Sequence, residues 1–493
     1  MNFDEYRQMD GVALAQAVAN KEVTASELLE VAIKRAEEVN PELNGLIIPL
    51  YEEARAVAKN PIAGPLSGVP MLSKDFYQEM AGAPHYMGSK GLKRINNIAQ
   101  SDSELVKRWR QAGLVIFGRT NTPEFAAKGI TEPEAWGATR NPWNTDHTPG
   151  GSSGGSAAMV AAGVVPFAGA NDGGGSIRIP AACCGLFGLK PGRGRVPWGP
   201  NMQEAMHGMA INHVVTRSVR DSAAVLDATH GDELGSLVKI ATPQNSYLEA
   251  IEQKTPTLRI AYSTRSPIGS EVDQEAIKAV EKTVKLLTDL GHHVEEAEPN
   301  IDGEQMMLEW LRMWFVNCAL TANEVRKLGA NRGSDMEIDT QVMAAVGSGM
   351  KAMDYVRGYY EVQKYGYQWD LFMQTYDFWL TPSLGMAPAK IGAMATPAIE
   401  KLGAKLALGL KAGSIIRHTG MLERVARENL KYTPFTQLAN VIGVPGMSVP
   451  LHWCDNGLPL GVQFVGAHGD EAKLLNLAAQ LEEAQPWFHR VPK

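Results

Sequence analysis

The glycine-rich stretch from 150 to 194 constrains the fold more than any other feature of this sequence. It reads GGSSGGSAAMVAAGVVPFAGANDGGGSIRIPAACCGLFGLKPGRG, so clusters of glycine and serine alternate with apolar runs. The apolar runs have the length of core strands and buried helices, and a flexible linker has no use for them. Glycine clusters allow tight turns in which the backbone closely approaches another group. The stretch therefore predicts a folded core that carries functional turns.

Helical and strand-like segments mix along the rest of the chain. Residues 25–40 and 272–291 place apolar side chains at helical spacing. Residues 101–112 predict a further helix, which we expect to begin with a capping box of Ser101 and Glu104. This mixture predicts an α/β fold with a large sheet. Strands are predicted at 114–118 and 257–263, and a hairpin at 447–453 and 458–467.

The domain organisation follows from length and from the absence of internal boundaries. A chain of 493 residues is long enough for one large domain or for two to three ordinary ones. We find no fixed-period repeat and no linker-like segment, so residues 1–493 are interpreted as a single domain. Within it, residues 304–430 are interpreted as a cap or insertion that shapes a substrate pocket.

Charge and cysteine usage exclude several classes of function. The net charge is −7 and no Lys/Arg-rich run occurs, which argues against a nucleic-acid partner. No window approaches the roughly 18 apolar residues of a membrane span, and the N-terminus does not read as a signal peptide. We expect a cytoplasmic protein without metal or cofactor, and a homodimer is the default for this size. The cysteines show neither metal-ligand spacing nor a disulfide pattern: Cys183, Cys184, Cys318 and Cys454.

Two serine clusters are candidates for nucleophilic chemistry. Residues 151–155 match G-x-S-x-G, but the segment before them is a loop, whereas a nucleophile elbow follows a strand. In the second cluster, Gly173, Gly174 and Gly175 precede Ser176 directly. Three glycines can turn several backbone N–H groups toward one point, so Ser176 would lie beside donors for an oxyanion. The alternative is a plain tight turn.

Lys74 is the candidate base. It follows the apolar segment GVPMLS, and lysine is rarely placed inside a core. A buried lysine without a carboxylate partner loses its charge easily and can accept a proton from a serine. The alternative is an ordinary surface lysine. None of the eleven histidines is singled out by its local sequence as a competing base.

Taken together, these segments resemble the amidase signature family. The resemblance rests on GVPMLSKD, GGSSGGSAA and NDGGGSIRIPAACCGLFGLKP in this order, and on the 24 positions that separate Ser152 from Ser176. It extends to GRTNTPEFA and to the closing segments GVPGMSVPLHW and LPLGVQFVGA. It implies one large domain with a mixed central sheet covered by helices on both faces. It also implies a hydrolase that cleaves C–N bonds of amides and needs no cofactor.

The resemblance assigns roles to individual residues. Ser176 would be the nucleophile, Ser152 the bridging serine and Lys74 the base, with a cis peptide between Gly151 and Ser152. Oxyanion donors would be backbone N–H groups of Gly173, Gly174, Gly175 and Ser176. Gly173 departs from the family, in which many members carry a larger apolar residue there. Residues expected to support the loops are Ser153, Asp172 and Arg178.

The substrate is less closely specified than the chemistry. Residues 131–144 and 40–54 resemble the 6-aminohexanoate cyclic dimer hydrolases within the family, and Cys318 matches a cysteine near their substrate. An aryl or alkyl amidase, an esterase or a carbamate hydrolase would use the same triad. The glutaminase subunit of a tRNA-dependent amidotransferase is a further alternative. Several side chains indicate either an apolar pocket or core packing: Met80, Tyr86, Met87, Trp310, Trp314 and Phe315.

Overall fold

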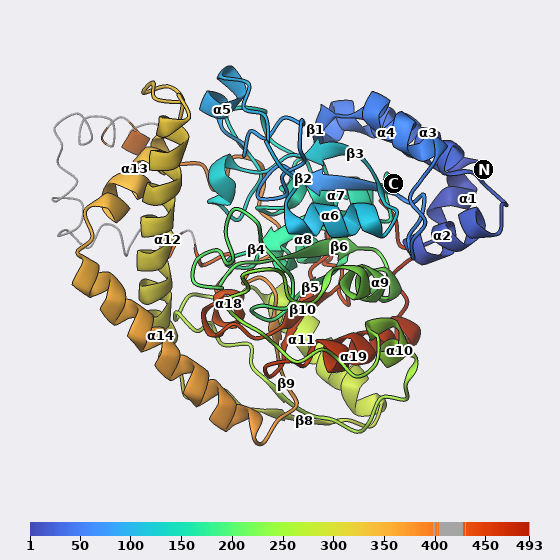
Figure 1. The fold of residues 1–493 in the computed structure, drawn as a ribbon. Helices are drawn as coiled ribbons and strands as arrows, with labels where there is room; N and C mark the ends of the chain where they lie inside the picture. The colour runs from blue at the N-terminus through green and yellow to red at the C-terminus, as the bar shows by residue number, and fades with distance from the viewer. Residues whose placement is uncertain (398–399, 402, 404–426, 429, 493) are drawn as a thin grey trace.

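A central sheet organises the molecule (Figure 1). The computed structural model describes residues 1–397, 400–401, 403, 427–428 and 430–492. The described strands form one sheet of 11 strands in the order β1-β3-β2-β4-β6-β5-β10-β11-β9-β7-β8. The neighbours of β2 run parallel to it, whereas β4, β6 and β5 pair antiparallel, so the sheet is mixed. Helices cover both of its faces, which confirms the predicted α/β class and the single domain.

The strands are short and mostly buried. Their bounds are β1 (Leu46–Pro49), β2 (Pro70–Lys74), β3 (Val115–Thr120), β4 (Phe167–Asp172), β5 (Phe187–Lys190), β6 (Ile211–Thr216), β7 (Arg259–Tyr262), β8 (His293–Glu296), β9 (Phe378–Pro382), β10 (Gly446–Val449) and β11 (Val462–Val465). The predicted hairpin is confirmed, because β10 and β11 pair antiparallel.

The helices are more varied in length. Their bounds are α1 (Phe3–Arg7), α2 (Gly11–Ala19), α3 (Ala25–Leu43), α4 (Tyr51–Lys59), α5 (Lys90–Arg94), α6 (Glu104–Gln111), η1 (Glu124–Ala126), α7 (Gly154–Ala161), α8 (Arg178–Cys184), α9 (Val219–Thr229), α10 (Tyr247–Glu252), α11 (Gln274–Asp289), α12 (Gly303–Lys327), α13 (Ile338–Ser348), α14 (Ala352–Met373), α18 (Gln437–Ile442) and α19 (Glu471–Ala484). None of the described helices is both long and apolar enough to cross a bilayer.

The predicted helices are present, but one predicted cap is wrong. Helix α6 begins at Glu104, and the side chain of Ser103 accepts a hydrogen bond from the Val106 amide. Ser103 is thus the N-cap in place of Ser101, because it occupies the position directly before the first helical residue. Helix α3 carries its own capping box, formed by Thr24 and Glu27.

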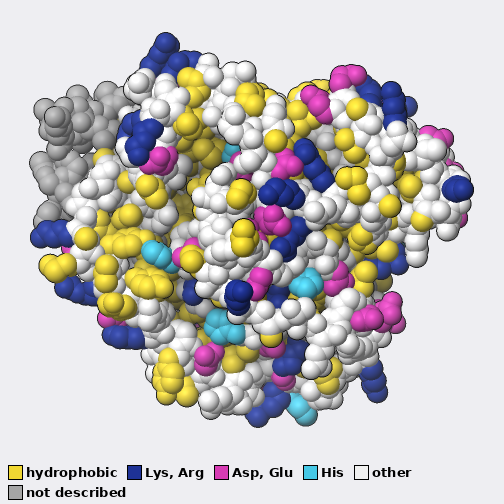
Figure 2. Space-filling view, viewed as in Figure 1, with side chains coloured by type: hydrophobic (Ala, Val, Ile, Leu, Met, Phe, Trp, Pro, Cys, Tyr) yellow, Lys and Arg dark blue, Asp and Glu magenta, His cyan; other side chains and the backbone are white. Residues whose placement is uncertain are grey.

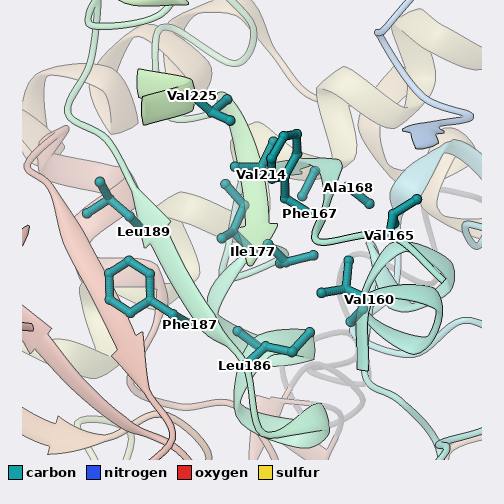
Figure 3. Close-up of a cluster of buried hydrophobic side chains, with 14 of the residues drawn as sticks. Val160, Val165, Phe167, Ala168, Ile177, Leu186, Phe187, Leu189, Val214 and Val225 are labelled. Carbon is teal, nitrogen blue, oxygen red and sulfur yellow. The ribbon is translucent and has the colours of Figure 1, made fainter. Parts of the chain in front are cut away.

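The core lies where the central strands meet α7 and α8 (Figure 3). Phe167 and Ala168 of β4 pack with Val160 of α7 and with Val214 of β6, and all four are fully buried. Complete burial of side chains of this size contributes about 1.5–3 kcal/mol each to folding. The glycine-rich stretch therefore runs through the centre of the protein, as its apolar runs predict.

The predicted cap at 304–430 is only partly outside the sheet. Helix α12 packs against both α13 and α14 at the left of Figure 1. Gly347 of α13 approaches the backbone of Phe315 so closely that a side chain would not fit between the two helices. Strand β9, however, lies between β11 and β7 in the central sheet, so this part of the range is core and not cap. Residues 398–399, 402, 404–426 and 429 of the range lie outside the described residues.

The surface in Figure 2 is mixed in character. Lys and Arg side chains are interspersed with Asp and Glu over this face, and hydrophobic side chains gather toward the side on which α12 and α14 lie. The most hydrophobic part of this face is thus the part next to α12 and α14.

Candidate active site

Two parallel strands, β2 and β4, bring Lys74 and the three-glycine turn close together. Lys74 is the last residue of β2, and β4 ends in Asn171 and Asp172 two positions before Gly174. The strands are parallel neighbours in register at Leu72 and Ala168. Their carboxyl ends therefore lie at the same edge of the sheet, which is where open α/β sheets bind ligands.

Lys74 is fully buried and contacts only neutral groups. Its Nζ donates to Asn171 Oδ1 over 2.6 Å and lies 2.7 Å from Ser152 Oγ. No carboxylate oxygen of the described residues lies within 4.0 Å of it. Burial holds the pKa of Lys74 well below its usual value, and the more distant charge of Asp172 opposes this only in part. Lys74 therefore gives up its proton more readily than an exposed lysine, as a base toward serine requires.

Ser152 lies in the loop that leads into α7. The peptide bond between Gly151 and Ser152 is cis, as the resemblance implies. Thr131 braces this loop, since its hydroxyl donates to the Gly150 carbonyl and accepts from the Gly154 amide. Ser153 Oγ donates to the Asn171 carbonyl over 3.4 Å, which ties the loop to β4.

Ser176 is the most accessible of the three predicted triad residues. Its exposed fraction is 9%, compared with 0% for Lys74 and 1% for Ser152, so a substrate reaches Ser176 first. Its Oγ makes no hydrogen bond to any other described residue, Ser152 included. Lys74 and Ser152 are thus brought together, whereas Ser176 lies at the end of the adjoining turn.

The three-glycine turn is fixed by bonds to its backbone. Gly175 has a φ of +126°, and a Cβ there would lie 2.4 Å from Thr436 Oγ1, so only glycine fits. The Gly175 amide donates to Asp172 Oδ1 over 2.6 Å and is therefore already engaged. The amides of Gly173, Gly174 and Ser176 make no hydrogen bond to another described residue.

Asp172 and Arg178 form a buried ion pair behind the turn. Arg178 Nε and Nη2 donate to the two carboxylate oxygens over 2.9 Å each. Arg178 also donates to Gln463 and Asn440. Burial alone would raise the pKa of Asp172, but the charge and hydrogen bonds of Arg178 bring it to about 2. The pair therefore stays ionised, and it holds the turn through the Gly175 and Ile177 amides.

Helix α12 crosses the site with one face. Trp310 stacks on Trp314 with ring centroids 5.1 Å apart, and Trp310 donates from Nε1 to the Gly173 carbonyl. Further along the same face, Cys318 is buried, and burial raises the pKa of its thiol to about 12. The thiol is thus neutral and unreactive. Of the other predicted pocket residues, Met80 is part of the main core cluster, and Tyr86 and Met87 pack in a smaller hydrophobic cluster.

Comparison with known proteins identifies the family. The sequence profile of the amidase family matches residues 27–475. A 6-aminohexanoate-cyclic-dimer hydrolase from Pseudomonas sp. (strain NK87) is 36% identical over 494 aligned residues, covering 98% of this chain and 96% of that protein. The chain belongs to the amidase signature family. As such it is an amidase, a hydrolase of carbon–nitrogen bonds other than peptide bonds.

Solved structures agree with this assignment to the amidase signature family. A structure of 6-aminohexanoate cyclic dimer hydrolase complexed with substrate superposes with a TM-score of 0.90 at 34% identity, covering 99% of both chains. A bacterial aryl acylamidase of the same family superposes with a TM-score of 0.83 at 26% identity, covering 97% of both chains. The fold is therefore that of amidase signature enzymes.

Three residues of this amidase site are missing from the sequence-based prediction. Asn171 lies inside the NDGGGS motif and could have been found as the residue that follows a buried strand and faces the lysine strand. Thr436 donates from Oγ1 to the Gly174 carbonyl over 2.6 Å, and Asn440 donates to the Asp172 carbonyl. They lie 262 and 268 residues further along the chain than their partners, and no local pattern marks them.

One group of described side chains in this amidase has the chemistry of metal ligands. Glu275, His452 and Cys454 approach one another on α11 and on the loop between β10 and β11. His452 Nε2 already pairs with Glu275 over 2.9 Å, and the Lys282 ammonium lies 3.3 Å from Nδ1. Both ring nitrogens are thus engaged, and we assign no ion to this group.

Proposed function

We propose that this amidase cleaves small or cyclic amides through an acyl-enzyme on Ser176, with Ser152 and Lys74 as a proton relay. The observation that supports it is the contact of a fully buried, carboxylate-free Lys74 with Ser152 over 2.7 Å. Sequence spacing and the family both agree with this assignment.

The hydrogen bonds of Lys74 suit the direction of proton transfer. A neutral amine has two N–H donors and one lone pair. The Asn171 carbonyl oxygen can only accept, so it takes one of the N–H groups. The structure has the second N–H of Lys74 directed at Ser152 Oγ. In the reactive state we propose that the lone pair accepts from the Ser152 hydroxyl instead, so that Ser152 can in turn accept a proton from Ser176.

The reaction runs in two halves. Ser176 Oγ attacks the amide carbon while its proton passes to Ser152 and the Ser152 proton passes to Lys74. The oxyanion is bound by the free amides of Gly173, Gly174 and Ser176, with the Gly175 amide left to Asp172. The tetrahedral intermediate collapses as the relay returns the proton to the leaving amine. Water then hydrolyses the acyl-enzyme by the same relay and releases the carboxylic acid.

For the substrate, we propose the 6-aminohexanoate cyclic dimer, with Cys318 near the bound amide. The similarity to cyclic dimer hydrolases over nearly the whole chain favours it. The similarity to an aryl acylamidase at 26% identity favours aryl amides as the second candidate. In both cases we propose that α12, α13 and α14 form the cap over the site.

Product analysis by mass spectrometry on a substrate panel tests the proposal. The panel contains the cyclic dimer, its linear dimer, an aryl amide, a carbamate and glutamine, each with Ser176→Ala as the control. Cleavage of the cyclic dimer above the others, abolished in the variant, would support the mechanism and the substrate. Cleavage of the aryl amide alone would keep the triad and discard the cyclic dimer. Turnover that survives in Ser176→Ala would overturn the assigned nucleophile.

A further inference from the structure

The turn that carries the proposed oxyanion donors lacks side chains of its own to hold it. Gly173, Gly174 and Gly175 have no Cβ, and glycine adopts many backbone conformations with little cost. A peptide plane between two glycines can therefore rotate and turn its N–H away from the substrate. Oxyanion binding needs donors that are oriented before the reaction, so another part of the protein must hold these planes.

Two side chains from distant elements hold the carbonyls of this turn. Trp310 Nε1 on α12 donates to the Gly173 carbonyl over 3.1 Å. Thr436 Oγ1, at the start of α18, donates to the Gly174 carbonyl over 2.6 Å. Trp310 is itself fixed, since only 5% of its surface is exposed and it stacks on Trp314.

The geometry of the peptide bond converts these contacts into donor orientation. In a trans peptide the C=O and the N–H of the next residue point in opposite directions. The bond from Trp310 to the Gly173 carbonyl therefore turns the Gly174 N–H to the other side of the chain. The plane between Gly174 and Gly175 is held at both ends, by Thr436 and by Asp172. The Gly174 N–H thus makes no hydrogen bond, but its orientation is fixed.

The packing around Gly174 supports the same conclusion. A Cβ on Gly174 would lie 2.5 Å from Cζ2 of Trp310, whereas a Cβ on Gly173 would meet only ordinary contacts of 3.5 Å or more. The indole thus lies directly over Gly174 and excludes any side chain there. Sequence alone placed Trp310 in an apolar pocket or in the core and gave no sign of a bond to the turn.

We propose that Trp310 is a positioning residue for catalysis, which orients the Gly174 amide toward the oxyanion of the reacting amide. The inference rests on the proposed function, because it presupposes an acyl-enzyme on Ser176. It gives α12 a part in transition-state binding in addition to covering the site. Trp310 itself touches the backbone of the turn and need not touch the substrate.

The test compares Trp310→Phe with Trp369→Phe. Both replacements keep an aromatic ring and remove one indole N–H that donates to a glycine carbonyl, since Trp369 Nε1 donates to Gly466. Steady-state kinetics use the panel amide that the wild-type protein cleaves fastest. Phenylboronic acid, which forms a tetrahedral adduct with an active serine, reports on the oxyanion donors directly. Melting temperatures check that each variant is folded.

We expect kcat of Trp310→Phe to fall by about 10- to 100-fold with KM changed less than about threefold, since a fully lost donor costs about 10²–10³ in kcat. The affinity for phenylboronic acid should fall in parallel, and Trp369→Phe should change neither. Wild-type kcat and boronate affinity in Trp310→Phe, or equal losses in both variants, would overturn the inference. Turnover in Ser176→Ala would instead overturn the proposed function itself.

Thr436 gives a second test that does not depend on the folding of Trp310→Phe. Thr436→Val removes the hydroxyl that holds the Gly174 carbonyl, while Thr436→Ser keeps it. A drop in kcat and boronate affinity in the valine variant, restored in the serine variant, would support the claim that side-chain hydrogen bonds to its carbonyls hold the turn in place. Equal behaviour of the two variants would count against it.

Discussion

Two buried basic side chains lie close to the same turn, and they are held in opposite ways. Arg178 is fully buried and makes two hydrogen bonds to the carboxylate of Asp172. Lys74 is equally buried, but its partners are the amide oxygen of Asn171 and the hydroxyl of Ser152. Arg178 is therefore part of a structural ion pair, whereas burial without a carboxylate lowers the pKa of Lys74 and makes it available for chemistry.

The difference follows from the cost of burying charge. An ion transferred from water into the interior loses several kcal/mol of solvation unless a counter-ion and hydrogen bonds compensate. Asp172 compensates Arg178 in this way, so the charged form is retained. No comparable group compensates Lys74, so its neutral form is favoured. Two adjacent residues of β4, Asn171 and Asp172, thus separate the candidate base from the structural cation.

Removing the candidate base should have the largest effect. We expect Lys74→Met to lower kcat by about 10⁴-fold or more, because removal of one member of a catalytic unit abolishes most of its effect. Lys285→Met, on the exposed face of α11, should leave kcat unchanged. Steady-state kinetics and circular dichroism on both variants provide the measurement. A loss below tenfold in a folded Lys74→Met protein would contradict the role of base.

Removing the structural counter-ion should mainly affect stability. Asp172→Asn leaves Arg178 without a carboxylate, and breaking a buried pair costs about 3–5 kcal/mol of the free energy of unfolding. Asp289→Asn is the matched control, since its pair with Lys285 is exposed and is worth about 0–1 kcal/mol. Urea unfolding of both variants measures the difference. Equal losses in the two variants would mean that burial does not distinguish these pairs.

Giving Lys74 a carboxylate should make it resemble Arg178. In Asn171→Asp, an acidic group replaces the amide that now accepts from Lys74, and a nearby opposite charge raises the pKa of a lysine. Because the neutral amine is the active form, activity is present above the pKa of Lys74 and lost below it. The acid limb of the kcat/KM profile should move to higher pH by about 1–3 units.

Asn171→Ala controls for loss of the acceptor, since it removes the amide oxygen without adding charge. Its acid limb should not move to higher pH. An unchanged profile in Asn171→Asp would show that Lys74 does not set this limb. The pH dependence of kcat/KM for the three proteins decides between these outcomes.

The low pKa of Lys74 should also have a smaller effect, on the pH dependence of the free energy of unfolding. Folded Lys74 binds no proton at a pH where the unfolded lysine does, so the wild-type protein loses stability as pH falls from about 10 toward the folded-state pKa. The Lys74→Met variant lacks this pH-dependent loss of stability. The free energy of unfolding of the variant, relative to wild type, should therefore rise by about 1.4 kcal/mol per pH unit on acidification in that window. Parallel curves from denaturant unfolding would indicate that buried Lys74 keeps its charge.

The sequence predicts the local parts of this site better than the distant ones. Lys74, Asp172, Ser176 and Arg178 lie in short motifs at or just after strand ends, and Ser152 lies in a loop directly before a helix. In such places the backbone turn already limits the position of a side chain. The helices at 25–40 and 272–291 follow from apolar periodicity alone, whereas the cap of α6 differs by two residues because two serines compete for it. The contacts of three further residues form only when distant elements pack together: Trp310, Thr436 and Asn440. The place of β9 in the sheet likewise depends on pairing with strands far away in the sequence.

The most direct test of the central claim is the site and rate of labelling by a fluorophosphonate, which phosphonylates activated serines. Peptide mapping by mass spectrometry should find one adduct, on Ser176. Its rate of formation should fall on acidification and be lost in Lys74→Met, because the neutral amine drives attack through Ser152. An adduct on Ser152 or Ser153, or an undiminished rate in Lys74→Met, would contradict the Ser176–Ser152–Lys74 relay.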